Sequence, residues 1–431
     1  MLPNHKNRLL LLVMTLLLPS MAMAQGEMNK TINTGDTAWV LISTAFVLMM
    51  TVPGLALFYA GMVRKKNILS TMMHSFGAAA VGSVLWVLVG YSLAFGSSGM
   101  NGFVGDLRFV LLHNIALSDV TGSIPTLLFV MFQMTFAVIA VAILSGSLAE
   151  RIKFSSFLLF CALWLVLVYA PVCHWVWGGG WLTGDALDFA GGTVVHVNAG
   201  VAGLVLAVLL GKRRGYGREF LAPANLTLTL IGTGLLWVGW FGFNGGSALG
   251  ANASAVMAVL VSQVAAAVGV LTWLLAERLH RGKASALGGA SGAIAGLVGI
   301  TPAAGFVDVG GAMAIGLLTA LGCFFSITVL KRKLGVDDSL DAFGLHGVGG
   351  IIGAVLTGIF ASPTVMGAEL VHGFWLQMWH QIEGVLAVMA YSGAVTLVIG
   401  LAIKRTLGLR VSDEEEYQGL DLALHGEKVG D

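Results

Sequence analysis

The chain has 431 residues, of which 57% are hydrophobic and only 10% are charged, and its formal net charge is +1. A soluble domain averages about 25% charged residues, so these charges are too few to cover a soluble surface of this size. The composition excludes an ordinary soluble protein and predicts a chain that crosses a lipid bilayer several times. No basic tract is long enough to indicate a nucleic-acid partner.

Residues 1–24 have the pattern of a secretory signal peptide. Lys6 and Arg8 form a basic start, an apolar run of about ten residues follows, and small residues end the segment at Ala24. The apolar run is short for a membrane span, which favours cleavage after Ala24 over the alternative of an uncleaved anchor. The mature chain would then begin outside the membrane.

Eleven long apolar segments follow, and they predict an all-α polytopic membrane protein. They cover residues 37–62, 69–97, 123–147, 155–177, 192–211, 225–246, 251–276, 284–301, 307–331, 342–361 and 379–403. The predicted organisation is therefore a membrane domain at 25–404 and a cytoplasmic tail at 405–431.

The distribution of lysine and arginine indicates how these segments are oriented. If the mature N-terminus lies outside, the connections after odd-numbered segments and the tail carry nineteen of the 23 basic residues. Only Lys30 and Arg108 would lie outside, and the signal peptide holds the other two. This positive-inside bias supports the count of eleven spans and predicts a cytoplasmic C-terminus.

Eleven spans suggest two inverted groups of five with one extra helix. Because five is an odd number, the second group would run in the opposite direction to the first. A weak internal echo agrees: an aspartate stands eight residues before a histidine at both the fifth and the tenth segments, as Asp188 before His196 and Asp338 before His346. Transporters often place the substrate path at the interface of such repeats.

His196 and His346 lie within predicted spans, where ionisable residues usually face the bundle interior and mark a pathway. Two neutral imidazoles can share one hydrogen bond and leave one nitrogen each for a ligand. The alternative is a structural histidine bonded to a neighbouring carbonyl. A metal site is disfavoured because no carboxylate or thiolate stands near enough to complete a zinc ligand set. We expect no metal or cofactor, and no nucleophile–base set indicates an enzyme.

Asp188 precedes the fifth segment, close to Gly191 and Gly192. Its carboxylate is expected to cap the free N–H groups at the start of the helix, where the helix dipole favours negative charge. A fixed negative charge at the outer mouth would also favour a cation. Asp338 and Asp341 stand at the start of the tenth segment, and capping is the default expectation for both.

Aromatic residues gather at the predicted outer ends of several spans. One interpretation is an aromatic belt at the lipid interface, and Trp175 and Trp240 would suit such a belt. The other is a ring of π faces with a hydroxyl that holds a small cation. The residues concerned are Phe132, Phe136, Trp177, Phe243 and Ser247.

Several stretches of the mature chain carry a more specific pattern. The most specific is DFAGGTVVHVNAGVAGLVLAVLLGKR, which begins at Asp188, and the others are PGLALFYAGMVRKKN, FQMTF, LAERIKF, WGGG, WFGFNGGSALG and DDSLDAFGLHGVGGIIG. Together they resemble the ammonium transporter / methylammonium permease / Rhesus family, and within it the bacterial ammonium transporters. The tail stretch LGLRVSDEEEYQGLDLALHGE resembles the tails of members that PII proteins regulate; the alternative is a disordered, solvated tail.

The resemblance implies a role for each of the residues singled out above. The outer ammonium site would consist of Trp177, Phe132, Phe136 and Ser247. The gate beneath it would be the stacked pair Phe136 and Phe243. The pore would be lined by the twin histidines His196 and His346, while Asp188 would support the outer site without lining the pore.

The resemblance also implies an activity and partners. Such a protein would capture ammonium, deprotonate it and conduct ammonia, with proton transfer that makes uptake electrogenic. It would be a homotrimer in the lipid of a bacterial inner membrane, serve nitrogen assimilation and bind a cytoplasmic PII signal protein through its tail. An ammonium sensor and a passive ammonia gas channel are the rival functions.

Overall fold

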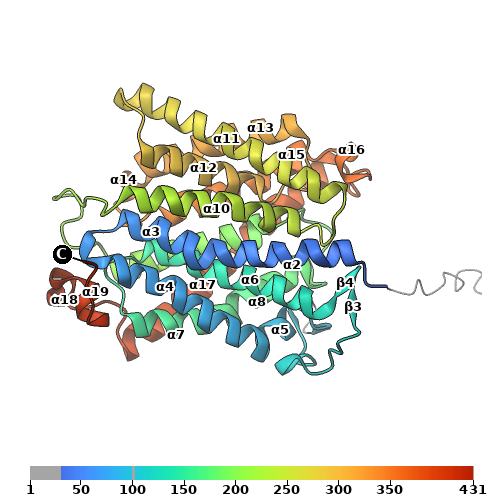
Figure 1. Cartoon of the computed structure of the whole chain (residues 1–431), viewed down its shortest axis with the longest axis horizontal. Helices are drawn as coiled ribbons and strands as arrows, with labels where there is room; N and C mark the ends of the chain where they lie inside the picture. The colour runs from blue at the N-terminus through green and yellow to red at the C-terminus, as the bar shows by residue number, and fades with distance from the viewer. Residues whose placement is uncertain (1–30, 100–101, 431) are drawn as a thin grey trace, which may run out of the picture.

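The computed structural model describes residues 31–99 and 102–430, so the predicted signal peptide at 1–24 lies outside the described residues. Helices dominate, and most of them run side by side in one bundle (Figure 1). The short helices α18 (Asp413–Gln418) and α19 (Leu420–His425) lie at one end of this bundle, which we name the tail face. The other end, where α2 (Thr34–Met49) begins, is named the opposite face.

The first five predicted segments correspond to five long helical units, and four of them contain a wider π-helical turn. The units are α2 with η1 (Met50–Leu55) and α3 (Ala56–Met62); η2 (Lys65–Asn67) with α4 (Ile68–Leu85), η3 (Trp86–Gly90) and α5 (Tyr91–Phe95); α6 (Thr126–Leu144) with η6 (Ser145–Ser147); α7 (Phe154–Trp164) with η7 (Leu165–Tyr169) and α8 (Ala170–Trp177); and η8 (Gly192–Val197) with α9 (Asn198–Leu210).

Six further units complete the bundle. They are α10 (Leu226–Gly246); α11 (Ala253–Arg281); α12 (Ala286–Ile300); α13 (Val309–Phe325) with η9 (Ser326–Leu330) and α14 (Lys331–Leu334); η10 (Phe343–Gly347) with α15 (Val348–Phe360); and α17 (Gly373–Thr406). The connections contain η5 (Val110–Leu112), α16 (Pro363–Met366) and two short antiparallel pairs, β1 (Ser98–Gly99) with β2 (Val104–Gly105) and β3 (Val120–Thr121) with β4 (Ile124–Pro125).

Ten of these units in the described part of the chain are long and apolar enough to cross a membrane, and the 15-residue α12 is the shorter eleventh. Glycines let α12 pack directly on the α11 backbone. A Cβ atom on Gly296 would come within 2.2 Å of the Ala265 carbonyl oxygen, and one on Gly292 within 2.6 Å of the Gly269 carbonyl oxygen. Such close contact is typical of membrane helices. The predicted eleven-helix, all-α fold is confirmed.

The largest boundary difference concerns the last helix. α17 begins at Gly373 rather than at residue 379, because its first turns carry Gln377 and His380, which dilute the apolar signal. A helix of this length presents those polar side chains to the loops of the opposite face, where they make specific contacts described below.

The tail packs against the bundle instead of extending into solvent. The backbone N–H of Leu420 donates to the Asn67 side chain at 2.8 Å, and the Asp421 carboxylate accepts from the backbone N–H of Ser70 at 2.7 Å. Arg410 pairs with the buried Glu416 carboxylate at 2.6 Å. The alternative of a disordered, solvated tail is therefore wrong for these residues.

Buried charges hold the loops of the tail face together. The Arg213 guanidinium donates to the Asp337 carboxylate at 2.9 Å and to the Glu150 carboxylate at 2.8 Å, and Arg64 donates to Glu150 at 2.9 Å. Burial raises the pKa of the Glu150 and Asp337 carboxyls, but the neighbouring arginines outweigh burial and leave both pKa values below their ordinary range. In the sequence, these arginines indicated only the orientation of the spans.

We expect Asp337→Asn to destabilise the folded protein by about 1.5–3 kcal/mol, because it removes one of the two carboxylates that neutralise the buried Arg213 guanidinium and leaves only Glu150. The lowered carboxyl pKa values also fix a pH dependence. The stabilisation is fully present above about pH 5 and is lost as the pH falls through the folded-state pKa values. Thermal unfolding in detergent should therefore show a wild-type Tm that drops at acid pH more steeply than the Tm of the variant.

The matched control for this substitution is Asp106→Asn. Asp106 pairs with Arg108 at 2.7 Å, but these side chains are 34% and 49% exposed, so water screens the pair and the Tm should barely change. Equal losses of Tm in the two variants would contradict the argument from burial.

Candidate transport site

The helical unit that contains His196 begins at a turn whose free N–H groups converge on one side chain. The Asp188 carboxylate accepts hydrogen bonds from the four backbone N–H groups of residues 191–194, at 2.6–3.0 Å. The capping expected from the sequence is confirmed. All four bonds use the carboxylate oxygens at the positive end of the helix, where a negative charge is most stabilised.

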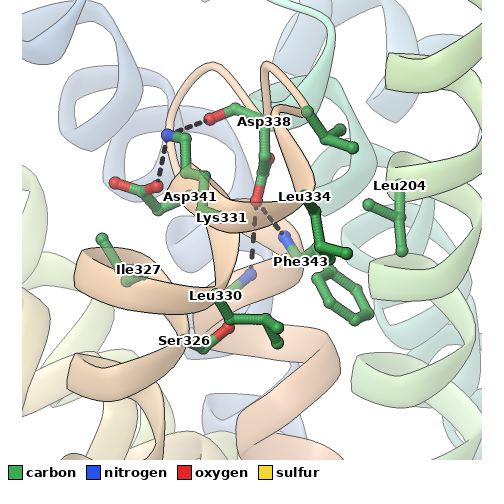
Figure 2. A pocket seen from close by; sticks show the side chains of 11 residues that line it. Leu204, Ser326, Ile327, Leu330, Lys331, Leu334, Asp338, Asp341 and Phe343 are labelled. Carbon is green, nitrogen blue, oxygen red and sulfur yellow. Dashed lines mark hydrogen bonds and ion pairs between the residues drawn. The ribbon is translucent and has the colours of Figure 1, made fainter.

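The unit that contains His346 begins in the same way. The Asp338 carboxylate accepts from the backbone N–H groups of residues 342–344 at 2.9–3.3 Å and from the Ser147 hydroxyl at 2.6 Å. Figure 2 shows this carboxylate directed at the backbone beside Phe343. The two aspartates eight residues before the two histidines are thus equivalent caps, as the internal echo suggested.

Asp341 is not a cap, and the default expectation for it is wrong. Its carboxylate accepts from the Lys331 ammonium group at 2.6 Å, and the same ammonium group donates to the backbone carbonyl of Asp338 at 2.6 Å (Figure 2). Asp341 has a positive φ of 60°, which turns the chain just before η10. Because Asp338 already takes the free N–H groups, Asp341 is left to neutralise a largely buried lysine.

His196 in η8 and His346 in η10 face each other. Their Nδ1 atoms are 3.1 Å apart, and their rings are stacked at 18° with centroids 5.2 Å apart. Both imidazoles are buried, and neither Nε2 atom has a hydrogen-bond partner among the described residues. If the two rings share one hydrogen bond, each still has one nitrogen for a third molecule.

Three aromatic rings connect the histidine pair with the opposite face. Phe136 and Phe243 stack with centroids 4.2 Å apart and planes at 18°. Phe243 lies 5.9 Å from His196 on one side of the stack, and Trp177 meets Phe136 edge-on at 5.9 Å on the other. The rings therefore form a continuous series from Trp177 to His196.

A cavity on the opposite face lies above the phenylalanine stack. Phe136, Trp177 and Ser247 are among the residues that line it. The Trp177 indole N–H donates to the Asp188 carbonyl at 2.8 Å, which fixes the ring, and the Ser247 hydroxyl donates to the Phe243 carbonyl at 2.8 Å. The Ser247 oxygen keeps its lone pairs as acceptors. Phe132 is fully buried, packs edge-on against Phe136 at 5.0 Å and is not among these lining residues.

Trp175 and Trp240 are buried inside the protein, so the interpretation of these two tryptophans as a lipid-facing belt is wrong. Trp175 is only 3% exposed, and Trp240 is 1% exposed. The Trp240 ring stacks on His196 at 5.6 Å and 19°, and its indole N–H donates to the Thr301 hydroxyl at 2.9 Å. Trp240 is thus a wall of the histidine site rather than an interfacial anchor.

Comparison with known proteins identifies the chain. Residues 38–429 match the model of a family described as the Ammonium Transporter Family. The chain belongs to the ammonium transporter family. An ammonium transporter from Aquifex aeolicus is 52% identical over 401 residues, which cover 92% of this chain and 94% of that protein.

Solved structures agree with this ammonium transporter assignment. Mep2 of Saccharomyces cerevisiae is 39% identical, with a TM-score of 0.83 and coverage of 90% of each chain. A structure described as a sensor Amt protein is 30% identical, with a TM-score of 0.85 and coverage of 91% of this chain and 98% of that one. A protein described as a sensor therefore shares this fold.

Two residues of this site are not among those that the sequence predicts for it. Gln133 lines the cavity, and its Oε1 atom is buried without a hydrogen-bond partner among the described residues. Trp240 contacts His196. Each stands three residues before a phenylalanine of the stack, Phe136 or Phe243, so helical spacing would have placed both on the same face as those rings.

Proposed function

We propose that the chain is an ammonium transporter that binds the cation in the Trp177 cavity, deprotonates it near Phe136 and Phe243, and passes ammonia along the histidine pair. The proton crosses separately through the two imidazoles, so uptake is electrogenic. The observation that carries the proposal is the buried His196–His346 contact, with one Nε2 atom on each ring free to bind a neutral hydrogen-bonding molecule.

The chemistry of ammonium explains why such a site selects it over potassium. The two cations have similar size and the same charge, but only ammonium can release a proton and become neutral. A desolvated ion in an apolar passage costs tens of kcal/mol in the Born limit, whereas ammonia can exchange hydrogen bonds with an imidazole. Selection therefore rests on deprotonation rather than on fit.

The cavity residues suit the capture step. The fixed Trp177 ring offers a π face to a cation, and the lone pairs of Ser247 accept an ammonium N–H. The Gln133 oxygen adds a second acceptor that the sequence-based site lacked. Phe132 contributes by backing Phe136, and Asp188 acts from below by holding Trp177 and capping the His196 helix.

Orientation and assembly are part of the proposal. The tail face would be cytoplasmic in a bacterial inner membrane, because the connections there carry most of the basic residues. Residues 25–404 would form the transport domain of a homotrimer with one pore in each protomer. The tail at 405–431, docked against Asn67 and Ser70, would receive a PII signal protein, and family membership supports both the homotrimer and this partner.

The test is a current measurement on proteoliposomes that contain the full chain. An inward ammonium step should give a transient current, and an equal potassium step should give none. Ammonia flux without current would favour a passive gas channel instead. Ammonium binding without current or flux would favour a sensor. The sensor is the second candidate function because the chain is similar to the sensor Amt protein.

We expect Trp177→Leu to raise the KM for ammonium by about 30-fold, because loss of a desolvated cation–π contact costs about 2 kcal/mol. The matched control is Trp375→Leu, since Trp375 lies on α17 with 83% of its surface exposed. Concentration-dependent proteoliposome currents give both KM values. A wild-type KM in the Trp177→Leu variant would contradict the proposal that the Trp177 ring binds ammonium.

A further inference from the structure

A second cluster of titratable side chains lies on the opposite face and belongs to neither the cavity nor the histidine pair. Asp185 follows α8, His372 stands just before α17, and His380 lies in the third turn of α17. One candidate ligand atom from each of these three residues lies within 4.8 Å of the others. We propose that Asp185, His372 and His380 bind a divalent transition-metal ion, with Zn²⁺ as the ion that suits these donors.

The distances are close to those that zinc requires. His372 Nε2 lies 2.9 Å from Asp185 Oδ1, and the two imidazole rings have centroids 4.9 Å apart. Nitrogen and oxygen ligands at about 2.0–2.2 Å from a tetrahedral ion are separated from one another by roughly 3.3 Å. The first pair already has nearly that separation, and the candidate ligand atom of His380 lies within 4.8 Å of both.

Glu383 supplies the outer support that metal-binding histidines usually have. Its carboxylate lies 3.3 Å from His380 Nδ1, one turn along α17. A carboxylate in that position accepts the Nδ1–H and leaves Nε2 as the electron-pair donor to the ion. The negative charges of Asp185 and Glu383 balance the charge of the ion, and a water molecule completes the fourth position.

Two buried glutamines of α17 bind the loop that carries Asp185, and so keep the Asp185 and His380 sides of the cluster at a fixed distance. Gln377 donates from its amide to the Asp185 carbonyl at 2.8 Å. The Gln381 amide accepts from the Leu187 N–H at 2.6 Å and donates to the Leu187 carbonyl at 2.9 Å. The loop that carries Asp185 is thus fastened to the helix that carries His380. Ligands on such a fixed base need little reorganisation when an ion enters.

The exposure of the cluster allows entry from solvent. The side chains of His380, His372 and Asp185 are 16%, 25% and 39% exposed, so the donors are neither sealed off nor dispersed on a flat surface. A plain ion pair between His372 and Asp185 would need neither the second imidazole nor its carboxylate partner. The bound ion would join the loop before Asp188 to α17 without entering the pore.

The test is a Zn²⁺ titration by calorimetry of the purified full chain, prepared without a polyhistidine tag. We expect saturation at one tight site per chain. His372→Gln and His380→Gln should each weaken binding by at least about 10-fold, and Glu383→Gln should do so by about 10-fold through loss of the outer support. His113→Gln is the matched control, because His113 is exposed in another connection and should leave binding unchanged.

Cobalt provides a readout that needs no variant. Co²⁺ bound to two imidazoles, a carboxylate and water should show the strong visible absorption of a four-coordinate ion, and added Zn²⁺ should remove it. Titration without saturation in a wild-type sample that elutes as a single species would overturn the proposal. So would zinc affinity that is equal in the wild type and in the His372→Gln/His380→Gln double variant.

Discussion

Replacing either His196 or His346 with alanine is expected to abolish the proton-coupled ammonium current, lowering it by about 100-fold or more, the usual effect of removing a group that transfers a proton. The two Nδ1 atoms are in direct contact, so either substitution breaks the only imidazole-to-imidazole link of the pair. The vacated space also admits water, which lowers the cost of a desolvated cation. Selectivity against potassium should therefore relax in the same variants.

The measurement is the current after matched ammonium and potassium steps in proteoliposomes. His74→Ala is the control, because His74 is a buried histidine in α4 that packs on Phe157 at 4.5 Å, outside the ring series. That variant should lose some stability but keep its ammonium current. Unchanged current and unchanged selectivity in both pore variants would remove the proton relay from the proposal.

Asp188→Ala is expected to have the largest effect on stability. It strips four buried backbone N–H groups of their acceptor, and each unsatisfied donor costs about 1–3 kcal/mol, so the free energy of unfolding should fall by about 4 kcal/mol or more. The turn that holds His196 would loosen at the same time. Thermal unfolding in detergent and the yield of folded protein give the result.

Asp338→Ala is the matched comparison, since Asp338 caps the other histidine helix with three backbone bonds. A similar loss of stability in both variants is expected from capping alone. Asp188→Asn then separates capping from charge, because the amide keeps an acceptor oxygen and removes the negative charge. A raised ammonium KM in Asp188→Asn, with no such change in Asp338→Asn, would show that the charge also favours the cation.

The sequence predicted the fold because apolar length and the placement of basic residues are strong signals in a membrane protein. The site residues contributed by crossings five and ten could be predicted from the spacing of Asp188 with His196 and of Asp338 with His346. Both signals are local, in that they depend on one segment at a time. The start of α17 was misplaced because polar residues there interrupt the apolar run.

Side-chain contacts between different segments could not be predicted from the sequence, because no pattern within one segment reveals which other segment packs against it. A belt position at the lipid interface is one interpretation of Trp240, because a tryptophan near the end of a span often lies there, whereas packing against His196 buries it. Asp341 was expected to cap a helix because the free N–H groups are nearby, but Asp338 had already taken them. The ion pairs of Arg213 join residues far apart in the chain, so no spacing rule could reveal them.

The Nδ1-to-Nδ1 contact makes the two histidines unequal at any instant. If one ring donates the shared proton, its Nε2 is bare, and the other ring must carry its proton on Nε2. A proton that enters on the bare side pushes the shared proton across and expels one from the far side, after which the polarity of the pair is reversed. The first ring then has no bare Nε2 atom. It cannot accept a second proton from the same side until the two tautomers exchange back. In the proposed relay, the contact would therefore pass one proton for each exchange of tautomers, and the current should stop after that transfer unless the pair returns to its starting tautomers.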